Sequence, residues 1–479
     1  MDTVIPGNFL NSRKKHKLSL SPSDLFFRIR RYFASRGTPV CAIFDNRKVG
    51  TPRVGRSIIC ANPVASLRLF TNHCEETIYD KTKTINYSDL ACKRQDILAF
   101  CLKSFAERLN CDSQVSTPIP GTPDYCTGFY GYTTYGAIEL CENISIKHEQ
   151  TTPLAEYFLF GVVIECDSIT NDAELSLTGC NYELEELISE RGASYLLTFE
   201  TTSQVRSSLT DEEHASAIAK SKTAILRGDV FQIVPSRRFS QDFRGDDFEV
   251  YTQLSKLNPS PYLFYFDLGN FTLFGSSPEA QLVVRNNQAV INPIAGTYMR
   301  SGVGSEDEIA IRKLQNDPKE LAEHVMLVDL ARNDLSRFCH PVHVEKFREV
   351  REYSHVIHLV SEVIGELKSG SSPIEVFAAT FPAGTLSGAP KYRAMELINQ
   401  IENCSRNFYG GSIGYFGFDG SIDQGIMIRT FHSKDGVLTT QAGGGIVFDS
   451  ITESEIAEVN NKLRALFTAV EMASNAERV

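Results

Sequence analysis

DPKELAEHVMLVDLARNDL, residues 317–335, is a helical stretch whose early turns carry the glutamates Glu320 and Glu323. A second helical stretch near the end of the chain repeats this spacing with Glu455 and Glu458. Residues three apart share one face of a helix, so each helix points two carboxylates in one direction. If the fold brings the two faces together, four carboxylates converge on one site. Oxygen ligands of that kind suit a hard divalent cation such as Mg²⁺, so the sequence predicts a metal site between these helices.

Each glutamate pair also has a structural interpretation, because both stretches carry signals of a helix start. Asp317 and Thr452 are suitable N-cap residues, and each lies three positions before the first glutamate of its pair. That spacing is typical of a capping box, in which the glutamate side chain bonds the backbone at the cap. The second glutamates, Glu323 and Glu458, lie one turn further in, where capping has no role. They are therefore the stronger metal candidates.

Length and composition limit the possible classes of protein. The chain has 479 residues, enough for two or three domains or one large domain, and its 42% hydrophobic and 22% charged content is ordinary for a globular protein. A net charge of −11 without a basic stripe argues against a nucleic-acid partner. No apolar run approaches the ~20 residues of a membrane span, and no apolar segment follows the basic run near the start, so neither a membrane anchor nor a secretory signal is predicted. Residues 1–20 are expected to form a solvated basic tail.

The twelve cysteines are scattered, ten of them before residue 181, and no Cys-x-x-Cys motif occurs. In a large chain without a secretory signal, this distribution favours reduced and mostly buried thiols. The sequence therefore predicts a cytoplasmic protein without a disulfide framework.

Two parts of the chain differ in character. In the region 21–195, CAIF and EYFLFGVVIEC are typical of strands, whereas SDLFFRIRRYFA and RQDILAFCLKSFAERL are typical of helices. A polar connection follows, and then Thr210 and Glu213 predict a capping box at the start of a helix that Gly228 ends. The region 205–475 holds nearly every residue with a chemical signal.

In this second region, polar groups or glycines interrupt apolar segments or occupy loops, at Gln232, Glu279, His358, Thr385, Arg429 and Gly443–Gly445. Gln232 belongs to the predicted strand DVFQIVPSRRFS, which would place it on one face with Val230 and Val234. Taken singly, the glutamine and the histidine also fit satisfied core residues, and the glycine triplet also fits a plain turn. Taken together, a metal site, an arginine, backbone amides and carboxylates suit a small polyanionic substrate bound by an acidic protein.

The order and the residues of the motifs in this region resemble those of the chorismate-utilising enzymes, in particular the large subunits of anthranilate synthases. The matching segments, in chain order, are GDVFQIVPSRRFS, NPSPYLF, LFGSSPEA, NPIAGT, ELAEHVMLVDLARNDL, TLSGAPK, YGGSIGYFG, IMIRT, AGGGIV and ESEIAEVNNK. The resemblance is continuous from about 205 to 475 and extends more weakly to ANPVASLRLF and GFYGYTTYGAIE in the N-terminal region.

This resemblance implies an α+β fold of two large, mostly antiparallel β-sheets packed together and flanked by helices, with the active site between them. It implies that Glu323 and Glu458 hold Mg²⁺ against the ring carboxylate of chorismate, with Glu455 and Glu320 beside the metal. It assigns substrate binding to Tyr409, Arg429, Lys462 and the amides of Gly443, Gly444 and Gly445, and catalysis to Glu279, Glu320, His358, Thr385 and Gln232. Within the catalytic group, Glu279 would protonate the departing C4 hydroxyl, and His358 with Thr385 would serve the later elimination of pyruvate.

Two positions indicate which reaction of the family this chain carries out. Family members that add water to C2 carry a lysine base where this chain has Gln232; water needs a base to become a nucleophile, whereas ammonia needs only orientation. Aminodeoxychorismate synthases use the lysine of a Pro-Ile-Lys-Gly-Thr motif as a nucleophile, and this chain has Ala295 there. The expected reaction is attack of ammonia on C2 and formation of anthranilate. A synthase that stops at 2-amino-2-deoxyisochorismate, and an inactive chorismate-binding regulatory subunit, are the alternatives.

The source of ammonia and the regulation can also be inferred. The chain lacks the Gly-x-Cys-x-Gly elbow of a glutaminase, so ammonia must come from a separate amidotransferase subunit, as in a heterotetramer, or from free ammonium. Feedback-inhibited relatives carry Leu-Leu-Glu-Ser in an N-terminal strand that lines a tryptophan pocket, and this chain has Ile43-Phe44-Asp45-Asn46 there. The other half of that pocket is kept, as Asn258, Pro259, Ser260, Pro261 and Tyr262. We therefore expect weakened inhibition by tryptophan.

Overall fold

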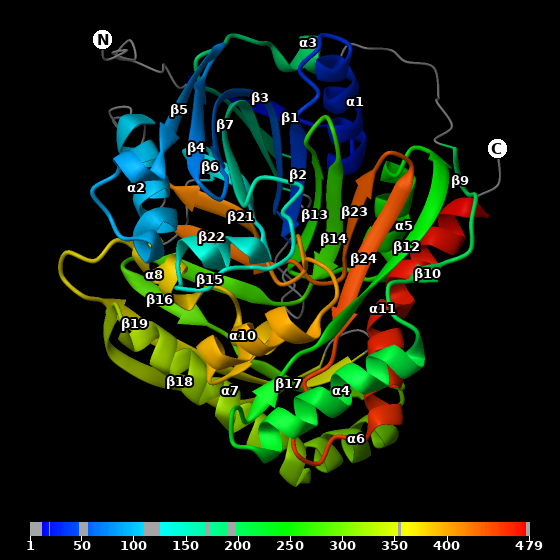
Figure 1. Ribbon diagram of the computed structural model, residues 1–479. Coiled ribbons are helices and arrows are strands. Elements are labelled where there is room, and N and C mark those ends of the chain that lie inside the picture. Colours follow the sequence, from blue (N-terminus) through cyan, green and yellow to red (C-terminus); the bar gives the residue numbers. More distant parts are fainter. Residues whose placement is uncertain are drawn as a thin grey trace.

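The computed structural model describes residues 12–18, 20–46, 56–109, 125–167, 172–188, 198–352 and 356–475. Twenty-two of the strands in these ranges are linked by hydrogen bonds, and the pairings between them are antiparallel. Through these pairings they form one continuous sheet with two branches, called here the first and the second sheet, which share the long strands β3 (Arg56–Leu69) and β7 (Ala155–Asp167). Eleven α-helices occur in the same described ranges, and they flank the strands (Figure 1). The predicted α+β fold with antiparallel sheets and flanking helices is confirmed.

In the first sheet, β7 pairs with β8, which pairs with β1 at one edge. On the opposite side, β3 pairs with β2, and the remaining strands follow from there. The other members of this sheet are β1 (Ser12–Lys17), β8 (Asp172–Leu177), β2 (Cys41–Asn46), β13 (Tyr262–Asp267), β14 (Thr272–Ser277), β23 (Thr430–Lys434), β24 (Val437–Gly443), β12 (Ser236–Gly245), β9 (Phe199–Thr201) and β10 (Arg206–Ser207).

The second sheet joins the same two long strands to the strands around β19. Its other members are β5 (Lys81–Asn86), β4 (His73–Ile78), β6 (Gly128–Thr133), β21 (Ser412–Gly417), β22 (Ile422–Ile426), β15 (Ala280–Arg285), β16 (Gln288–Ile291), β19 (Val356–Leu367), β17 (Ile294–Met299) and β18 (Cys339–Glu352). A separate pair consists of β11 (Gln232–Ile233) and β20 (Gly388–Ala389).

The helices lie on the faces and at the ends of these sheets (Figure 1). They are α1 (Pro22–Ala34), α2 (Ile97–Leu109), α3 (Leu184–Ile188), α4 (Asp211–Leu226), α5 (Phe248–Leu257), α6 (Gly304–Asn316), α7 (Pro318–Ser336), α8 (Pro373–Thr380), α9 (Gly384–Ser387), α10 (Lys391–Ile401) and α11 (Thr452–Ser474). No helix among the described residues is both long and apolar enough to cross a membrane.

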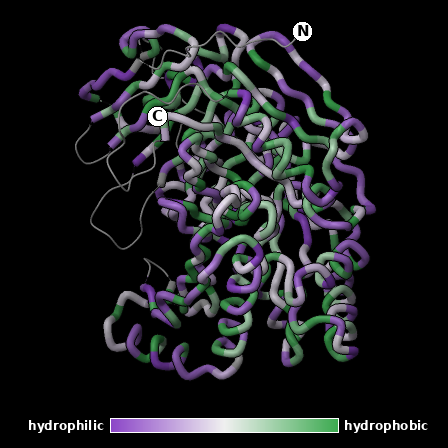
Figure 2. Tube along the Cα trace, turned by 90° about the vertical axis from the view of Figure 1, so that its left-hand side faces the viewer, coloured by the Kyte–Doolittle hydropathy of each residue, from purple (hydrophilic) through white to green (hydrophobic). Residues whose placement is uncertain are grey.

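The N-terminal and C-terminal parts of the chain share their sheets. Strand β2 pairs with β13, which places Phe44 opposite Phe264, and β6 pairs with β21, which places Tyr130 opposite Tyr415. Hydrophobic residues (green) alternate with hydrophilic ones (purple) along many of these strands and helices (Figure 2). The division into the regions 21–195 and 205–475 stays a prediction, although strands of both regions belong to the same sheets.

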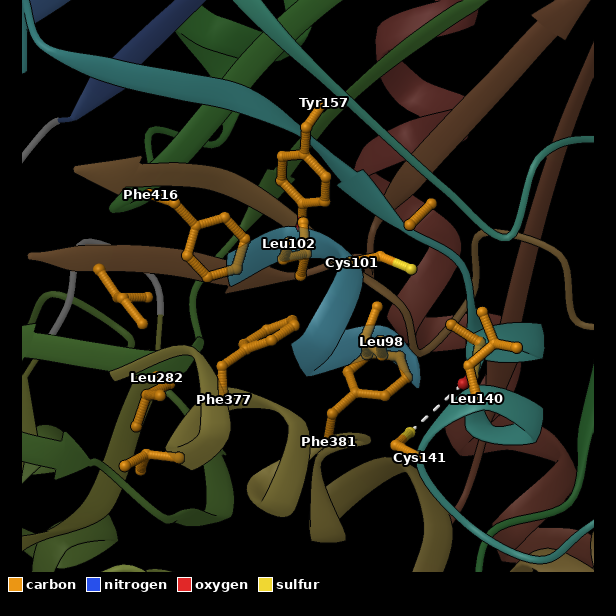
Figure 3. Close-up of a cluster of buried hydrophobic side chains, with 14 of the residues drawn as sticks. Leu98, Cys101, Leu102, Leu140, Cys141, Tyr157, Leu282, Phe377, Phe381 and Phe416 are labelled. Atoms are coloured by element: carbon orange, nitrogen blue, oxygen red, sulfur yellow. Dashed lines mark hydrogen bonds between the residues drawn. The ribbon is translucent and has the colours of Figure 1, made fainter. Parts of the chain in front are cut away.

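One of the hydrophobic clusters joins helices to the second sheet. Leu98 and Leu102 of α2 lie beside Phe381 and Phe377 at α8, and Tyr157 of β7 and Phe416 of β21 belong to the same cluster (Figure 3). The ring centroids of Phe377 and Phe416 are 5.1 Å apart, with the rings edge to face. Such aromatic burial supplies large apolar area, which fixes α8 and the following α9 relative to the sheet.

Several local predictions can be compared with the structure. The predicted strands and helices of the N-terminal region correspond to β2, β7, α1 and α2. The capping box is formed, since Glu213 N–H donates to the Thr210 hydroxyl and Thr210 N–H donates to the Glu213 carboxylate. The eleven cysteines in the described ranges are free thiols, as predicted.

The predicted cap at Thr452 is wrong. Helix α11 starts one residue earlier than a Thr452 cap requires, with Ile451 at the N-cap and no capping bond from a side chain. Glu455 N–H donates instead to the Ile451 carbonyl, as in an ordinary helix turn. At the start of α7, by contrast, the Asp317 carboxylate accepts a bond from Glu320 N–H, as a cap does. Capping therefore does not explain the Glu455 side chain.

The predicted basic tail is wrong within its described part. Residues 12–17 form the strand β1, which pairs with β8. Its basic side chains form ion pairs with acidic ones, with Lys17 Nζ 2.6 Å from Asp172 and Lys14 Nζ 2.5 Å from Glu183. Backbone pairing and opposite charge keep this segment on the sheet.

The predicted strand around Gln232 is interrupted. Pro235 lacks an N–H group and separates β11 from β12, which pair with different partners. The predicted burial pattern is nevertheless correct, because Val230, Gln232 and Val234 are buried while Phe231 is exposed.

Candidate active site

Gln232 and Glu323 form a direct contact between β11 and α7. The side-chain amide Nε2 of Gln232 donates a 2.8 Å hydrogen bond to Glu323 Oε1. Gly445 makes room for this pair, because a Cβ at that position would lie 2.3 Å from Gln232 Nε2 and 3.4 Å from Glu323 Oε1. Gln232 is 2% exposed, and its Oε1 has no hydrogen-bond partner among the described residues. A buried acceptor of this kind is costly unless a ligand satisfies it.

The second acidic helix brings Glu455 to the neighbouring glycine. A Cβ at Gly444 would lie 3.1 Å from Glu455 Oε2, and the Glu455 side chain is buried. The carboxylates of Glu323 and Glu455 therefore approach the same two-residue segment, one from α7 and the other from α11. The structure places glutamates of the two predicted pairs at one site.

Glu458 lies differently from its helix neighbour. Its carboxylate is 2.7 Å from Lys462 Nζ, and both side chains are more than one third exposed. Lys462 Nζ also donates a 2.9 Å bond to the Gly443 carbonyl, which places it at the end of β24 beside the glycine triplet. Within the described ranges, no group of three or more histidine, cysteine, aspartate or glutamate side chains is placed to hold a metal.

His358 and Glu320 both approach Gly296. His358 Nδ1 donates a 2.8 Å bond to the Gly296 carbonyl, and a Cβ at Gly296 would lie 3.1 Å from Glu320 Oε2. Gly296 has φ +67°, a conformation that favours glycine. Burial lowers the pKa of His358, so the imidazole is neutral at pH 7 and, with its proton on Nδ1, carries its lone pair on Nε2.

Glu279 and Thr385 form a second pair of predicted site residues. Glu279 follows β14, and Thr385 lies on α9; the Thr385 hydroxyl donates a 2.9 Å bond to Glu279 Oε1. Burial raises the pKa of Glu279 to about 7, against the opposing effects of Thr385, Lys462 and Arg429. A carboxyl group with this pKa carries a proton in a large fraction of molecules near neutral pH, as a general acid requires.

Arg429 and Tyr409 complete the predicted set. Arg429 has φ +50°, a strained backbone conformation for a residue with a side chain, and its charge acts on Glu279. Tyr409 is buried, and a Cβ at Gly443 would lie 3.1 Å from its hydroxyl. Both residues therefore lie among the other predicted site residues.

Three structural supports of the site were not predicted from the sequence. They are the Gly296 carbonyl that orients His358, the buried pair of Lys391 and Asp334 with a 2.5 Å contact, and the buried pair of Arg406 and Glu402. The only sequence signal for the last pair is the spacing of four residues between opposite charges, which is common on exposed helices and so indicates little.

The two segments predicted to form an effector pocket are adjacent. Asp45 of β2 lies opposite Leu263 of β13; its buried carboxylate accepts a 3.0 Å bond from the Ser57 hydroxyl. The Asn46 side chain lies outside the described part of the structure. The residues Asn258, Pro259 and Ser260 connect α5 to β13, and the Asn258 carbonyl accepts a bond from Ser276.

A small cavity lies beside these segments, and Phe44 and Tyr262 both line it. The Tyr262 hydroxyl donates a 2.9 Å bond to Asp423 Oδ1, and the Tyr125 hydroxyl donates a 2.9 Å bond to Asp423 Oδ2. Aromatic rings and one paired carboxylate therefore surround the cavity.

Comparison with known proteins agrees with this geometry. The model of the chorismate binding enzyme family matches residues 41–468, and the chain belongs to that family. Within the family, the chain is similar to anthranilate synthase component 1 of Aquifex aeolicus, with 38% identity over 74% of this chain and 76% of the relative. Anthranilate synthase component 1 of Pseudomonas aeruginosa is 35% identical over 83% of this chain and 85% of the relative. The crystal structure of anthranilate synthase component I from Streptococcus pneumoniae TIGR4 superposes on this chain with a TM-score of 0.73 and 30% sequence identity. The match covers 88% of this chain and 93% of the crystallised one.

Proposed function

We propose that this chain is the large subunit of an anthranilate synthase, which converts chorismate and ammonia into anthranilate and pyruvate in tryptophan biosynthesis. The observation that carries the proposal is the position of Gln232, a buried amide whose nitrogen is held by Glu323 and whose oxygen has no partner in the described structure. An acceptor in this position suits the N–H groups of ammonia. Its relatives named anthranilate synthase component 1 support the proposal.

The first step, addition of ammonia at C2, depends on Gln232 and Glu279. Ammonia has a lone pair and needs orientation rather than a base, and the oxygen of Gln232 supplies orientation. As the nitrogen bonds to C2, both ring double bonds shift, the C4 hydroxyl departs as water with a proton from Glu279, and the new ammonium group releases one proton to give the amine. Glu279 is suited to this role because burial raises its pKa to about 7. The product of this step is 2-amino-2-deoxyisochorismate.

The second step is the elimination of pyruvate, with His358 as the base. Neutral His358, fixed by its bond to the Gly296 carbonyl, accepts the C2 proton at Nε2. The C3–O bond breaks, the ring becomes aromatic, and the enolpyruvyl group leaves as pyruvate after its methylene carbon gains a proton. Thr385 lies beside Glu279 and orients that carboxyl group through both steps.

The donor set fits Mg²⁺. Mg²⁺ commonly takes one or two protein carboxylates and completes its octahedron with water and substrate oxygens, and Glu323 and Glu455 supply two carboxylates at adjacent glycines. When bound, the ion would neutralise the substrate carboxylate against the acidic helices. Glu458 would join only by giving up its contact with Lys462, so Glu455 is the better partner of Glu323. Arg429, Tyr409, Lys462 and the glycine amides would bind the substrate carboxylates.

The partner is proposed to be a glutamine amidotransferase subunit. The sequence has no glutaminase elbow, and its relatives are named as the first component of an enzyme. The free thiols in the described ranges support a cytoplasmic setting, and a heterotetramer with the amidotransferase is the proposed assembly. Tryptophan is the proposed effector of the cavity beside Phe44 and Tyr262, with reduced affinity because of Asp45 and Asn46.

The proposal is tested by the products of the purified chain with chorismate, Mg²⁺ and ammonium. Anthranilate and pyruvate support it. Accumulation of 2-amino-2-deoxyisochorismate supports instead a synthase that lacks the lyase step, and the absence of turnover supports an inactive chorismate-binding subunit.

A further inference from the structure

Arg406 and Glu402 form a fully buried ion pair behind the site. The side chains of Arg406 and Glu402 are 1% and 5% exposed, Arg406 Nη2 lies 2.6 Å from Glu402 Oε1, and Nε lies 2.9 Å from Oε2. Glu402 is the C-cap residue of α10, and Arg406 lies in the loop that leads to β21. A buried pair of this kind has a large desolvation cost, so stability alone is a weak reason for it.

The other donors of Arg406 all bond the backbone of site segments. Nη1 donates a 2.7 Å bond to the Leu386 carbonyl, next to Thr385, and Nη2 donates a 2.5 Å bond to the Val234 carbonyl, two residues after Gln232. The guanidinium therefore connects α9 to the segment that follows β11.

Glu402 and Arg406 each contact further residues near the site. Glu402 Oε1 accepts bonds from Ser236 N–H at 2.9 Å and from the Ser236 hydroxyl at 2.6 Å, which fixes the start of β12. The Arg406 guanidinium carbon lies 5.4 Å from the ring centroid of Tyr409 and 4.7 Å from that of Tyr135. Cation–π contact of this kind orients the rings.

We infer that Arg406 is a positioning residue, which sets the distances between Gln232, Thr385 and Tyr409 through one rigid fork. The inference rests on the proposed function, because those three residues are its proposed nucleophile-orienting, elimination and carboxylate-binding groups. A planar guanidinium with five donors in fixed directions can bond Glu402 and two carbonyls at once; a lysine ammonium keeps the charge but cannot reproduce the fork.

The test is the Arg406→Lys variant in the ammonium-dependent reaction, with rates expressed per folded molecule. Displacement of Gln232 is expected to raise the KM for ammonia at least ~10-fold, which corresponds to ~1.4 kcal/mol. Displacement of Thr385 is expected to increase the released fraction of 2-amino-2-deoxyisochorismate relative to anthranilate. Both readouts concern the geometry of the site, and a loss of stability alone changes neither.

Arg30→Lys is the matched control. Arg30 is also largely buried, donates to Asp246 at 3.0 Å and Asp267 at 2.9 Å, and lies over the Tyr265 ring, with no contact to the site residues. This variant is expected to lower the melting temperature without changing the KM for ammonia or the product ratio.

Ser236→Ala is the milder second variant, since it removes the hydroxyl that donates to Glu402 and accepts from Gln441 Nε2, and leaves Arg406 in place. It is expected to change both readouts in the same direction by a smaller factor, and it decides the question if Arg406→Lys does not fold. Unchanged KM for ammonia and an unchanged product ratio in the folded variants would overturn the inference. Failure of the wild-type protein to form anthranilate would instead refute the proposed function.

Discussion

The side-chain amide of Gln232 donates a 2.8 Å hydrogen bond to Glu323, so the residue proposed to orient ammonia is joined to a carboxylate proposed to hold the metal. Donation from Nε2 leaves Oε1 as the acceptor for a ligand. The same bond couples the choice of nucleophile to the acidic helix α7. Changes on either side of this contact should therefore affect both ammonia use and metal dependence.

Activity should fall as pH rises above about 7. Glu279 must carry a proton to act as an acid, and its pKa is raised by burial to about 7, so its protonated fraction falls tenfold per pH unit well above that value. Thr385 lowers this pKa by donating to Glu279, so Thr385→Val should move the alkaline limb to higher pH. The measurement is kcat/KM for chorismate against pH at a fixed concentration of free ammonia. A flat profile from pH 7 to 9, or a limb that moves to lower pH in the variant, would contradict the role of Glu279.

Glu323→Gln should remove Mg²⁺-dependent turnover while the fold remains. Loss of a ligand to a charge-stabilising metal is worth several kcal/mol, so we expect a decrease of roughly 100-fold or more in kcat/KM. Glu453→Gln, an exposed change in the first turn of α11, is the control and should be neutral. Mg²⁺ titration of the rate distinguishes them, and an unchanged Mg²⁺ dependence in Glu323→Gln would show that the metal ligands are assigned wrongly.

Gly445→Ala should weaken the use of ammonia. The new Cβ would lie 2.3 Å from Gln232 Nε2, closer than van der Waals contact allows, so the Gln232 side chain must move. We expect the KM for ammonia to rise at least ~10-fold, equivalent to the loss of about one hydrogen bond. Gly304→Ala on α6, where a Cβ meets nothing within 4 Å, is the control. Equal KM values for ammonia in the two variants would mean that the amide position is unimportant.

Gln232→Lys should decrease ammonia-dependent product formation and can open a water-dependent route to isochorismate. The lysine supplies a base that water needs, but it also loses the amide acceptor and approaches Glu323 as a cation. Product chromatography with and without ammonium measures both routes. Formation of anthranilate at the original rate would show that Gln232 is only a core residue.

Tryptophan should inhibit this protein at least about tenfold more weakly than a relative with serine at position 46, or not at all. Loss of one hydrogen bond to a charged group costs ~1.5–3 kcal/mol, and ~1.4 kcal/mol is a tenfold change in affinity. Asp45 is in addition engaged by Ser57, which reduces its availability to a ligand. Titration of tryptophan against the initial rate tests this, and half-inhibition at low micromolar tryptophan would contradict it.

The features that could be predicted from the sequence are those whose residue spacing follows from helix or strand geometry. The repeated glutamates, the apolar strands and the Thr210 capping box were recognisable because charge spacing and periodicity follow directly from helix and strand geometry. The cap at Thr452 was mispredicted because a helix can start one residue earlier without a side-chain cap. The basic run 13–17 was mispredicted because its acidic partners on β8 and near α3 are more than 150 residues away in the chain.

The supports of the site were beyond sequence reasoning for a similar reason. The bonds from Arg406 to the Val234 and Leu386 carbonyls join segments that are far apart in the sequence, and backbone acceptors leave no pattern in it. That Glu455 approaches Gly444 while Glu458 contacts Lys462 depends on how α11 is rotated about its axis, which the three-residue spacing does not determine.

The most direct test of the central claim is the identity of the product. Purified protein is incubated with chorismate, Mg²⁺ and ammonium, and the mixture is resolved by chromatography with a parallel assay for pyruvate. We predict anthranilate and pyruvate in equal amounts, dependent on both Mg²⁺ and ammonium. Accumulation of 2-amino-2-deoxyisochorismate without anthranilate, or formation of isochorismate in the absence of ammonium, would contradict the account.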